Sequence, residues 1–364
     1  MTAAGRVMSS AYMQWAKTRS HARYGLAGSG LAHYPLADLP VRLEDLELSG
    51  PSYYGYAPLQ KAIARYAEAP EECVVATTGA SMANYLAMAV TLEPGDEVVI
   101  EQPAYELLAN AAEYLGAKVR HLRRSLENGW GIDLRAVERL LNRRTKLIVI
   151  TNLHNPTSTL TGEATLRGLG VIARDAGARV LVAEVYLHAA FDRTPRSAFH
   201  LGPEFITTDS LTKVYGLSGL RCGWALAQPD VAQKMWRLND LFGVIPAHPA
   251  ERLSCVAFAH LDRIAARSRA ILDANHAAFN RLLDAREDLE APPLEFGTVA
   301  FPRLKEGSVD RFCGLLREKY ETAVVPGSFF DLPEHFRIGL GGDPATTRDG
   351  LERVGLALDE LHGT

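Results

Sequence analysis

SLTKVYGLSGLRCGW, residues 210–224, places Lys213 three residues after Ser210 and eight residues before Arg221. A lysine amine forms a Schiff base with a carbonyl compound. A hydroxyl group and a guanidinium group suit a phosphate, and the guanidinium binds it through paired charge-assisted hydrogen bonds. The stretch is therefore expected to hold a phosphorylated aldehyde, with Lys213 as the point of covalent attachment.

The composition indicates a soluble enzyme of two domains. The chain has 364 residues, which is more than one compact core usually holds, and 47% of them are hydrophobic, which is enough to fill two cores. The net charge of −4, with both signs dispersed, gives no basic surface for nucleic acid, and no apolar run is long enough to span a membrane. Residues 1–6 lack the layout of a secretory signal, so we expect a cytoplasmic protein. The four cysteines show no metal or redox spacing, and we expect no bound metal.

Short apolar runs alternate with helical patterns between residues 73 and 227, which is typical of a mostly parallel sheet with crossover helices. The pattern predicts strands at residues 73–77, 97–101, 118–122, 147–151, 179–183, 205–209 and 222–227. It predicts helices at residues 82–91, 105–115, 134–141 and 161–176. We therefore expect an α/β fold with its site at the carboxyl ends of the strands.

The pattern changes after residue 246 to that of an α+β domain. A long helical run from about residue 249 to residue 283 is followed by an extended stretch at 295–303 and a helix near 309–320. Short extended segments at 323–326 and 336–340 precede a final helix at 346–361. We expect a large domain at residues 46–246 and a smaller domain formed by residues 1–45 and 247–364.

The segment TTGASM, residues 77–82, follows a β-branched strand and opens a helix. The N–H groups and the dipole of a helix start bind anions, and small residues let a phosphate approach. Together with the pattern Ser-x-x-Lys-x-x-Gly-x-x-Gly-x-Arg-x-Gly at residues 210–223, this segment resembles the cofactor site of fold-type I pyridoxal-phosphate (PLP) enzymes, specifically the class I/II aminotransferases. The resemblance implies the PLP-transferase fold, a three-layer sandwich, and a phosphate site made of Gly79, Ala80, Ser81, Met82, Ser210, Thr212 and Arg221.

The same resemblance implies contacts to the pyridine ring. Tyr105 follows a strand where the family usually places an aromatic ring that stacks on the cofactor. The segment NLHNPTS, residues 152–158, resembles the family's Asn-Pro-Thr-Gly element, with Ser158 where Gly is common. Asn155 and Tyr186 are then the donors to the phenolate oxygen of the ring.

Ala183 departs from the family pattern. Residues 183–186, AEVY, resemble the family's Asp-Glu-Val-Tyr, whose Asp pairs with the pyridine nitrogen and keeps it protonated. Glu184 is not an obvious substitute, because neighbouring strand residues point to opposite faces. Three interpretations of Ala183, at this cofactor-binding position, remain. The protein is a disabled engineered variant, its reaction tolerates an unprotonated nitrogen, or another group or a water molecule replaces the Asp as the partner of the nitrogen.

Two further elements are expected to contact the substrate. HFRIGL, residues 335–340, resembles the element whose arginine, here Arg337, grips the substrate α-carboxylate beside Asn155. LAGSGL, residues 26–31, resembles the flexible segment that closes over the substrate and contributes Gly28 and Gly30. Tyr53 or Tyr54 stands where family members often reach a neighbouring subunit's phosphate, which implies a homodimer.

The resemblance spans about residues 26–340 and implies a PLP-dependent aminotransferase that acts on an amino acid and a 2-oxo acid through a Lys213 Schiff base. One alternative is a PLP-dependent β- or γ-eliminating lyase or specialised biosynthetic enzyme. The other is a catalytically weak binding or regulatory protein with the same fold, which Ala183 makes conceivable.

Overall fold

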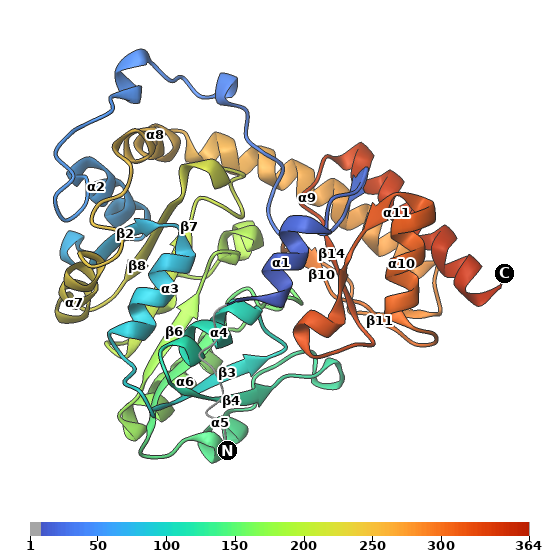
Figure 1. The fold of residues 1–364 in the computed structure, drawn as a ribbon, viewed down its shortest axis with the longest axis horizontal. Coiled ribbons are helices and arrows are strands. Elements are labelled where there is room, and N and C mark those ends of the chain that lie inside the picture. The colour runs from blue at the N-terminus through green and yellow to red at the C-terminus, as the bar shows by residue number, and fades with distance from the viewer. Residues whose placement is uncertain (1–8, 364) are drawn as a thin grey trace.

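The computed structural model describes residues 9–363, and its centre is a seven-stranded sheet in the order β2-β8-β7-β6-β5-β3-β4 (Figure 1). β8 runs antiparallel to both of its neighbours, and the other pairs are parallel. All seven predicted strands are present, at β2 Val74–Thr78, β3 Glu97–Gln102, β4 Lys118–Arg123, β5 Thr145–Thr151, β6 Arg179–Ala183, β7 Phe205–Ser210 and β8 Cys222–Leu226.

Helices cover both faces of this sheet. Leu181 of β6 belongs to the core that includes Leu86 of α3, Ala80–Ala89, whereas Val180 and Val182 join the core that includes Leu169 of α6, Glu163–Ala176. Successive strand residues thus serve opposite cores, as the pleat requires. The three-layer α/β sandwich is confirmed. Its remaining helices are α2 Ala57–Tyr66, α4 Glu106–Tyr114, α5 Leu134–Leu140 and α7 Pro229–Asn239.

Elements from both ends of the chain form a smaller α+β part, on the right in Figure 1. β14, Phe336–Gly339, is flanked by β10, Val299–Ala300, and β13, Val325–Pro326, and the N-terminal strand β1, Tyr24–Gly25, pairs with β12, Thr322–Ala323. The division at residues 45 and 246 stays a prediction. Residues 1–8, which the prediction included in the small domain and read as lacking a signal, lie outside the described residues. The other elements of this part are α1 Ala11–Thr18, β9 Leu289–Glu290, β11 Arg303–Leu304, α10 Val309–Tyr320 and α11 Pro344–His362.

The predicted helical run from about residue 249 to 283 is two helices, α8, His248–Ala259, and α9, Leu261–Asp284. His260 separates them with non-helical dihedrals, φ −124° and ψ 20°. α8 packs against α2, whereas α9 packs against α11, so the break redirects the chain from one part to the other. Within residues 9–363, every helix is too short or too polar to cross a membrane.

Glu184 follows β6 and lies on the face opposite Ala183. The Ser197 hydroxyl donates to its Oε2 at 2.6 Å, and the Ala198 N–H donates to its Oε1 at 2.8 Å. It borders a separate cavity of about 210 Å³ together with His188 and Asp209. Burial raises the pKa of Glu184 from its ordinary 4.5 to about 7. Glu184 is therefore committed to the far side of the sheet and does not replace the missing Asp.

This raised pKa predicts a pH-dependent stability. Between pH 4.5 and about 7 the native protein keeps a proton on Glu184 that the unfolded chain has lost, so stability falls as pH rises through that window. At about 1.4 kcal/mol per pH unit, the loss approaches about 3 kcal/mol. Glu184→Gln removes this titration. Its free energy of unfolding in urea, relative to wild type, should rise by about that amount between acid and neutral pH, and a difference that is constant with pH would contradict the assignment.

Candidate active site

A cavity of about 400 Å³ lies beside the carboxyl ends of β5, β6 and β7, where ligands of open α/β sheets bind. Most of the predicted site residues line it, although they come from segments far apart in sequence. Those residues are Gly28, Ala80, Ser81, Tyr105, Asn155, Ala183, Tyr186, Ser210, Thr212, Lys213 and Arg221. Four predicted residues, Gly30, Gly79, Met82 and Arg337, are not part of its lining. Gly30, Gly79 and Arg337 contact lining residues instead.

Gly79 lets Arg221 cross the loop at one end of the cavity. Gly79 has φ +82°, and a Cβ atom there would lie 2.2 Å from Nη2 of Arg221. β8 approaches equally closely, because a Cβ on Gly223 would lie 2.3 Å from the carbonyl carbon of Gly79. The start of α3, the hydroxyl of Ser210 and the guanidinium of Arg221 thus form a set of donors that could hold a phosphate. Met82 packs against the hydrophobic core instead.

Lys213 points into the cavity from the loop after β7. Its Nζ donates to Oγ of Ser29 at 2.9 Å and lies 6.0 Å from the centroid of the Tyr186 ring. Gly30 packs on the Lys213 backbone, because a Cβ there would lie 3.4 Å from the lysine carbonyl oxygen. The N–H of Leu31 donates to that oxygen at 2.8 Å. The segment around Gly28 and Gly30 therefore holds the lysine from the side of the smaller part.

Arg337 lies in the middle of β14 and is fully buried. Its Nη1 donates to Oδ1 of Asn155 at 3.1 Å, and its Nη2 donates to Oη of Tyr12 at 2.9 Å and to the carbonyl of Ala27 at 3.2 Å. Among residues 9–363 its Nε has no hydrogen-bond partner, and the rings of Tyr12 and Phe330 lie 5.7 and 5.2 Å from the guanidinium carbon. The partners of this buried cation are all neutral, so a carboxylate would complete its shell.

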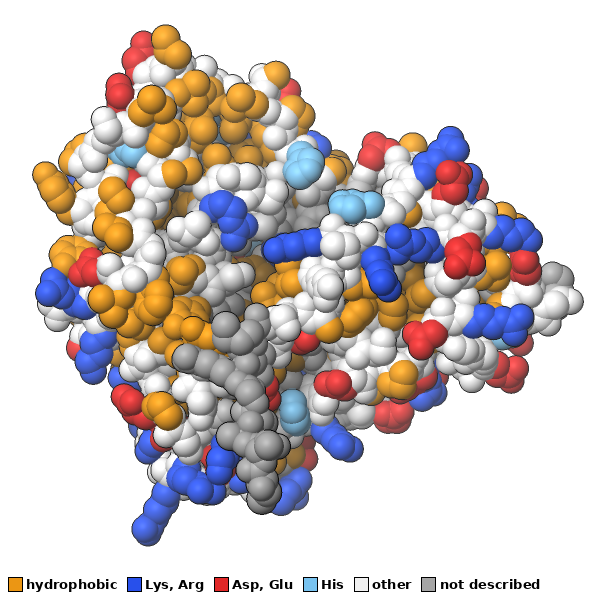
Figure 2. Space-filling model, in the orientation of Figure 1, with side chains coloured by type: hydrophobic (Ala, Val, Ile, Leu, Met, Phe, Trp, Pro, Cys, Tyr) orange, Lys and Arg blue, Asp and Glu red, His pale blue; other side chains and the backbone are white. Residues whose placement is uncertain are grey.

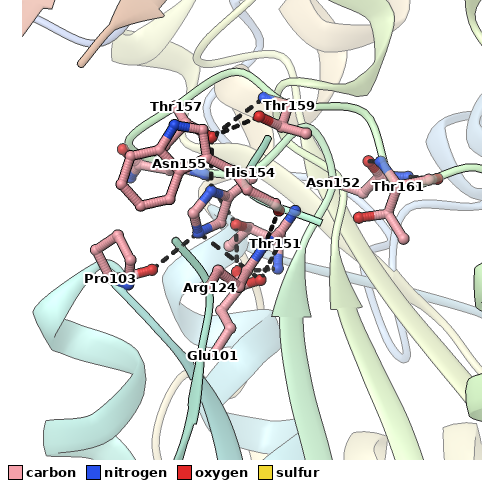
Figure 3. Close-up of polar contacts among 11 residues, drawn as sticks. Glu101, Pro103, Arg124, Thr151, Asn152, His154, Asn155, Thr157, Thr159 and Thr161 are labelled. Atoms are coloured by element: carbon pink, nitrogen blue, oxygen red, sulfur yellow. Dashed lines mark hydrogen bonds and ion pairs between the residues drawn. The ribbon is translucent and has the colours of Figure 1, made fainter. Parts of the chain in front are cut away.

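A buried ion pair holds the loop that carries Asn155 (Figure 3). Oε2 of Glu101 and Nη1 of Arg124 are 2.7 Å apart. Thr151 donates to Oε1 of Glu101 from both its N–H and its hydroxyl, each at 2.6 Å, and its Oγ1 accepts from the N–H of Asn155 at 2.9 Å. Removing one partner of such a pair typically costs about 3–5 kcal/mol. Asn155 is thus fixed through Thr151 to charges in the core.

His154, the residue before Asn155, closes the same network. Nε2 of His154 lies 2.8 Å from the carbonyl oxygen of Pro103, and Nδ1 lies 2.7 Å from Oγ1 of Thr157. Burial holds the pKa of His154 well below 6.5, so the ring is neutral and Nε2 is the donor. Sequence analysis missed Glu101, Arg124 and His154. The charged residue at the end of an otherwise apolar strand, Glu101, was the available signal.

Ser158 occupies the position where the family often has Gly, and its backbone explains that preference. Its φ is +61°, a left-handed conformation that Gly adopts without strain. The hydroxyl of Ser158 donates to the carbonyl of Val299 at 2.7 Å, directly above Gly297, where a Cβ would lie 2.3 Å from that hydroxyl oxygen. This bond ties the Asn155 loop to the strand beside β14.

Helix α1 forms a wall of the cavity that sequence analysis did not predict. Tyr12, Met13 and Ala16 of α1 line it, as does Ser20 just after the helix, and Figure 1 shows α1 between the large sheet and the small strands. The Tyr12 N–H donates to Oε2 of Glu106 at 2.9 Å, which docks α1 on α4. The ring of Tyr105, also in the lining, meets Tyr12 edge to face with 5.8 Å between centroids. The aromatic pair thus forms part of the cavity wall.

Known proteins share this architecture. The family profile "Aminotransferase class I and II" matches residues 45–354. Capreomycidine synthase from Streptomyces vinaceus is 30% identical, over 96% of this chain and 92% of that protein. Histidinol-phosphate aminotransferase from Symbiobacterium thermophilum is 29% identical, over 83% and 81%. A PLP-dependent aminotransferase structure from Streptococcus suis superposes with a TM-score of 0.92 at 26% identity and covers 98% and 99% of the two chains. The chain belongs to the class I and II aminotransferase family of pyridoxal-phosphate-dependent enzymes.

Proposed function

We propose that this PLP-dependent aminotransferase exchanges the amino group of an α-amino acid with a 2-oxo acid, and that Arg337 and Lys213 are its carboxylate-binding and proton-transferring residues. The observation that carries the proposal is the fully buried Arg337, whose hydrogen-bond partners in the described part of the chain are all neutral. An uncompensated buried cation is costly, and its planar fork matches a carboxylate. The α-carboxylate that all such substrates share supplies the missing charge.

The cavity residues fit the cofactor. Ser210, Arg221 and the start of α3 suit its phosphate, the amine of Lys213 suits its aldehyde, and Tyr105 offers an aromatic face. Oδ1 of Asn155 is occupied by Arg337, so the amide NH₂ is the part of Asn155 left to donate to the ring oxygen, beside Tyr186. When bound, PLP supplies an electron sink for the bond that is broken at the substrate Cα.

The protein supplies orientation and proton transfer. A substrate carboxylate held by Arg337 fixes which Cα bond faces the amine of Lys213. The free amine of Lys213 would take the proton from the substrate Cα and deliver it to the carbon that carried the cofactor aldehyde. Oγ of Ser29, 2.9 Å from Nζ, holds that amine at the edge of the cavity. Tyr12 and the rest of α1 exclude water from the opposite side.

A second candidate is a specialised biosynthetic or eliminating reaction on the same cofactor. Two observations favour it: the absence of a carboxylate at Ala183, and the 30% identity to a protein named capreomycidine synthase over 96% of this chain. Release of ammonia and a keto acid from an amino acid without any 2-oxo acid acceptor would identify elimination. Conversion of an added 2-oxo acid into an amino acid would identify transamination.

We also propose a cytoplasmic homodimer. Exposed apolar side chains gather on one side of the molecule, over the parts of the chain around α2 and α7 (Figure 2). A patch of this kind marks a protein contact, and twofold dimers are the commonest oligomer. Tyr53 and Tyr54 lie in the same region, and either could reach the partner's phosphate site. Exposed large apolar side chains of the segments that precede α2 and follow α7 include Leu43, Leu48, Tyr53, Tyr54, Leu241, Phe242, Val244 and Ile245, which we call the apolar patch. The four free cysteines fit a reducing compartment.

Lys213 should carry the cofactor. Borohydride reduction of the PLP-loaded protein followed by peptide mapping should place the pyridoxyl group on Lys213, because its amine points into the cavity. Lys213→Ala should bind PLP without a covalent bond and should slow Cα proton exchange by about 10²- to 10⁴-fold. Lys305→Ala, at an exposed lysine, is the control. An adduct on any other lysine would exclude this assignment.

Arg337 should recognise the carboxylate. Arg337→Lys loses the fork, and kcat/KM for amino acids should fall by about 10- to 150-fold, the range for hydrogen bonds to charged groups. The matched control is Arg353→Lys, since Arg353 also donates to a tyrosine hydroxyl, that of Tyr24, at 2.9 Å, but outside the cavity. A primary amine that lacks the carboxylate should react at the same slow rate with wild type and with Arg337→Lys. Equal losses for amine and amino acid in Arg337→Lys would refute the role.

The dimer should depend on the apolar patch. Phe242→Asp puts a charge into the patch and should convert a dimer into a monomer in size-exclusion chromatography with light scattering at micromolar concentration. Val171→Asp, at a similarly exposed valine on α6, should remain dimeric. A wild-type monomer that is fully loaded with PLP would rule out the dimer.

A further inference from the structure

The wall of the cavity around Ala183 carries a polar side chain that the functions above do not use, Asn84 of α3. Ala183 and Asn84 both line the cavity. Thr208 of β7 lies directly opposite Ala183 in the strand register, and it is fully buried. α3 covers this face of β6 and β7, and Oγ1 of Thr208 lies 2.6 Å from Oδ1 of Asn84. Asn84 and Thr208 thus meet next to the position where the carboxylate is missing.

We propose that Asn84, oriented by Thr208, is the hydrogen-bond partner of the PLP ring nitrogen in this enzyme, and that it binds that nitrogen in its unprotonated form. This inference rests on the proposed function, because it requires PLP to attach at Lys213. Asn84 contacts the cofactor, and Thr208 is a positioning residue.

The distance between Thr208 and Asn84 fixes the orientation of the amide. A separation of 2.6 Å is normal for O–H···O and short for N–H···O, so the buried Thr208 hydroxyl donates to the amide oxygen. The amide NH₂, which can only donate, is then directed elsewhere. Asn84 also borders a neighbouring cavity of about 300 Å³. Within the described residues, its NH₂ donates to no protein acceptor. It is a donor without a protein partner at the cavity wall.

The substitution pattern of PLP leaves this donor for the ring nitrogen. The nitrogen lies across the ring from the carbon that bears the aldehyde, and the phosphate arm and the ring oxygen flank that aldehyde. Lys213, the Ser210–Arg221 set and the Asn155–Tyr186 pair account for these three groups. On the wall formed by α3 and the end of β6, Ala183 offers only a methyl group. Of the two polar residues of α3 in the lining, Ser81 is assigned to the phosphate, and Asn84 is left to make this hydrogen bond.

An amide donor has the opposite effect on the ring from a carboxylate. An N–H group can bind the lone pair of an unprotonated nitrogen, whereas a protonated nitrogen would face a second donor. A carboxylate at contact distance instead favours the protonated form, commonly by about one to three pKa units. The cofactor ring in this enzyme would therefore withdraw electron density more weakly than a protonated ring. This property suits a specialised reaction more than rapid transamination.

Nitrogen NMR tests the proposal without turnover. The enzyme is loaded with PLP carrying ¹⁵N in the ring, whose chemical shift distinguishes protonated from unprotonated pyridine. Wild type should give the unprotonated signal throughout about pH 6 to 9. Asn84→Asp and Ala183→Asp, which each add a carboxylate, should give the protonated signal. Thr208→Val, which frees the amide to turn, should give a signal that moves with pH.

Thr207→Val is the matched control, because Thr207 directly precedes Thr208 in β7 and accepts a hydrogen bond from Ser197 on the other face of the sheet. It should keep the wild-type signal. A second measurement compares the affinity for PLP with that for its analogue with carbon in place of the ring nitrogen. Wild type should prefer PLP by about two- to tenfold, the value of one hydrogen bond, and Asn84→Leu should lose this preference.

A protonated nitrogen in wild type, or an Asn84→Leu protein that keeps both the wild-type signal and the preference for PLP, would overturn the inference. If the pyridoxyl group maps to Lys213 in that protein, the proposed function still stands. If no adduct forms at Lys213, both fail.

Discussion

The hydrogen bond between Arg337 and Asn155 is the contact on which the site depends. It joins β14 of the smaller part to the loop after β5 of the large sheet, so the two parts meet at the proposed carboxylate site. Neither residue is held by that bond alone. Asn155 is fixed by Thr151 and the buried Glu101–Arg124 pair, and Arg337 is enclosed by the Tyr12 and Phe330 rings. Several contacts thus position each of the two side chains at the junction.

Much of this arrangement could be predicted from sequence, because it depends on local patterns. The strands are β-branched runs with glycine or helical signals at their ends, and the segment around Lys213 has a spacing that few other sites share. The predicted lining residues meet because parallel strands bring their carboxyl ends to one edge. The pleat explains why Glu184, one residue after Ala183, is turned away from the cavity.

The rest could not be predicted because it depends on contacts between distant segments. Nothing near Tyr12 indicates that its hydroxyl meets Arg337, and nothing near Arg124 indicates a bond to Glu101. The Asn84–Thr208 contact requires the exact placement of α3 over β7. His260 divides two helices inside a stretch whose alanines and arginines all favour a helix, so propensity was overridden by the different packing of α8 and α9.

The segment around Gly28 and Gly30 has a mechanical consequence. The carbonyl of Leu26 accepts from Gly339 at 2.7 Å, and five residues later Leu31 donates to the carbonyl of Lys213 at 2.8 Å. A Cβ on Gly339 would lie 1.7 Å from the Gly28 oxygen, so residues 26–31 lie in direct backbone contact with the strand that carries Arg337. One stretch of six residues is therefore bonded at one end to the strand that carries Arg337 and at the other to the backbone of Lys213. Under the proposed roles, the group that would recognise the substrate carboxylate and the group that would move the proton share this single backbone connection.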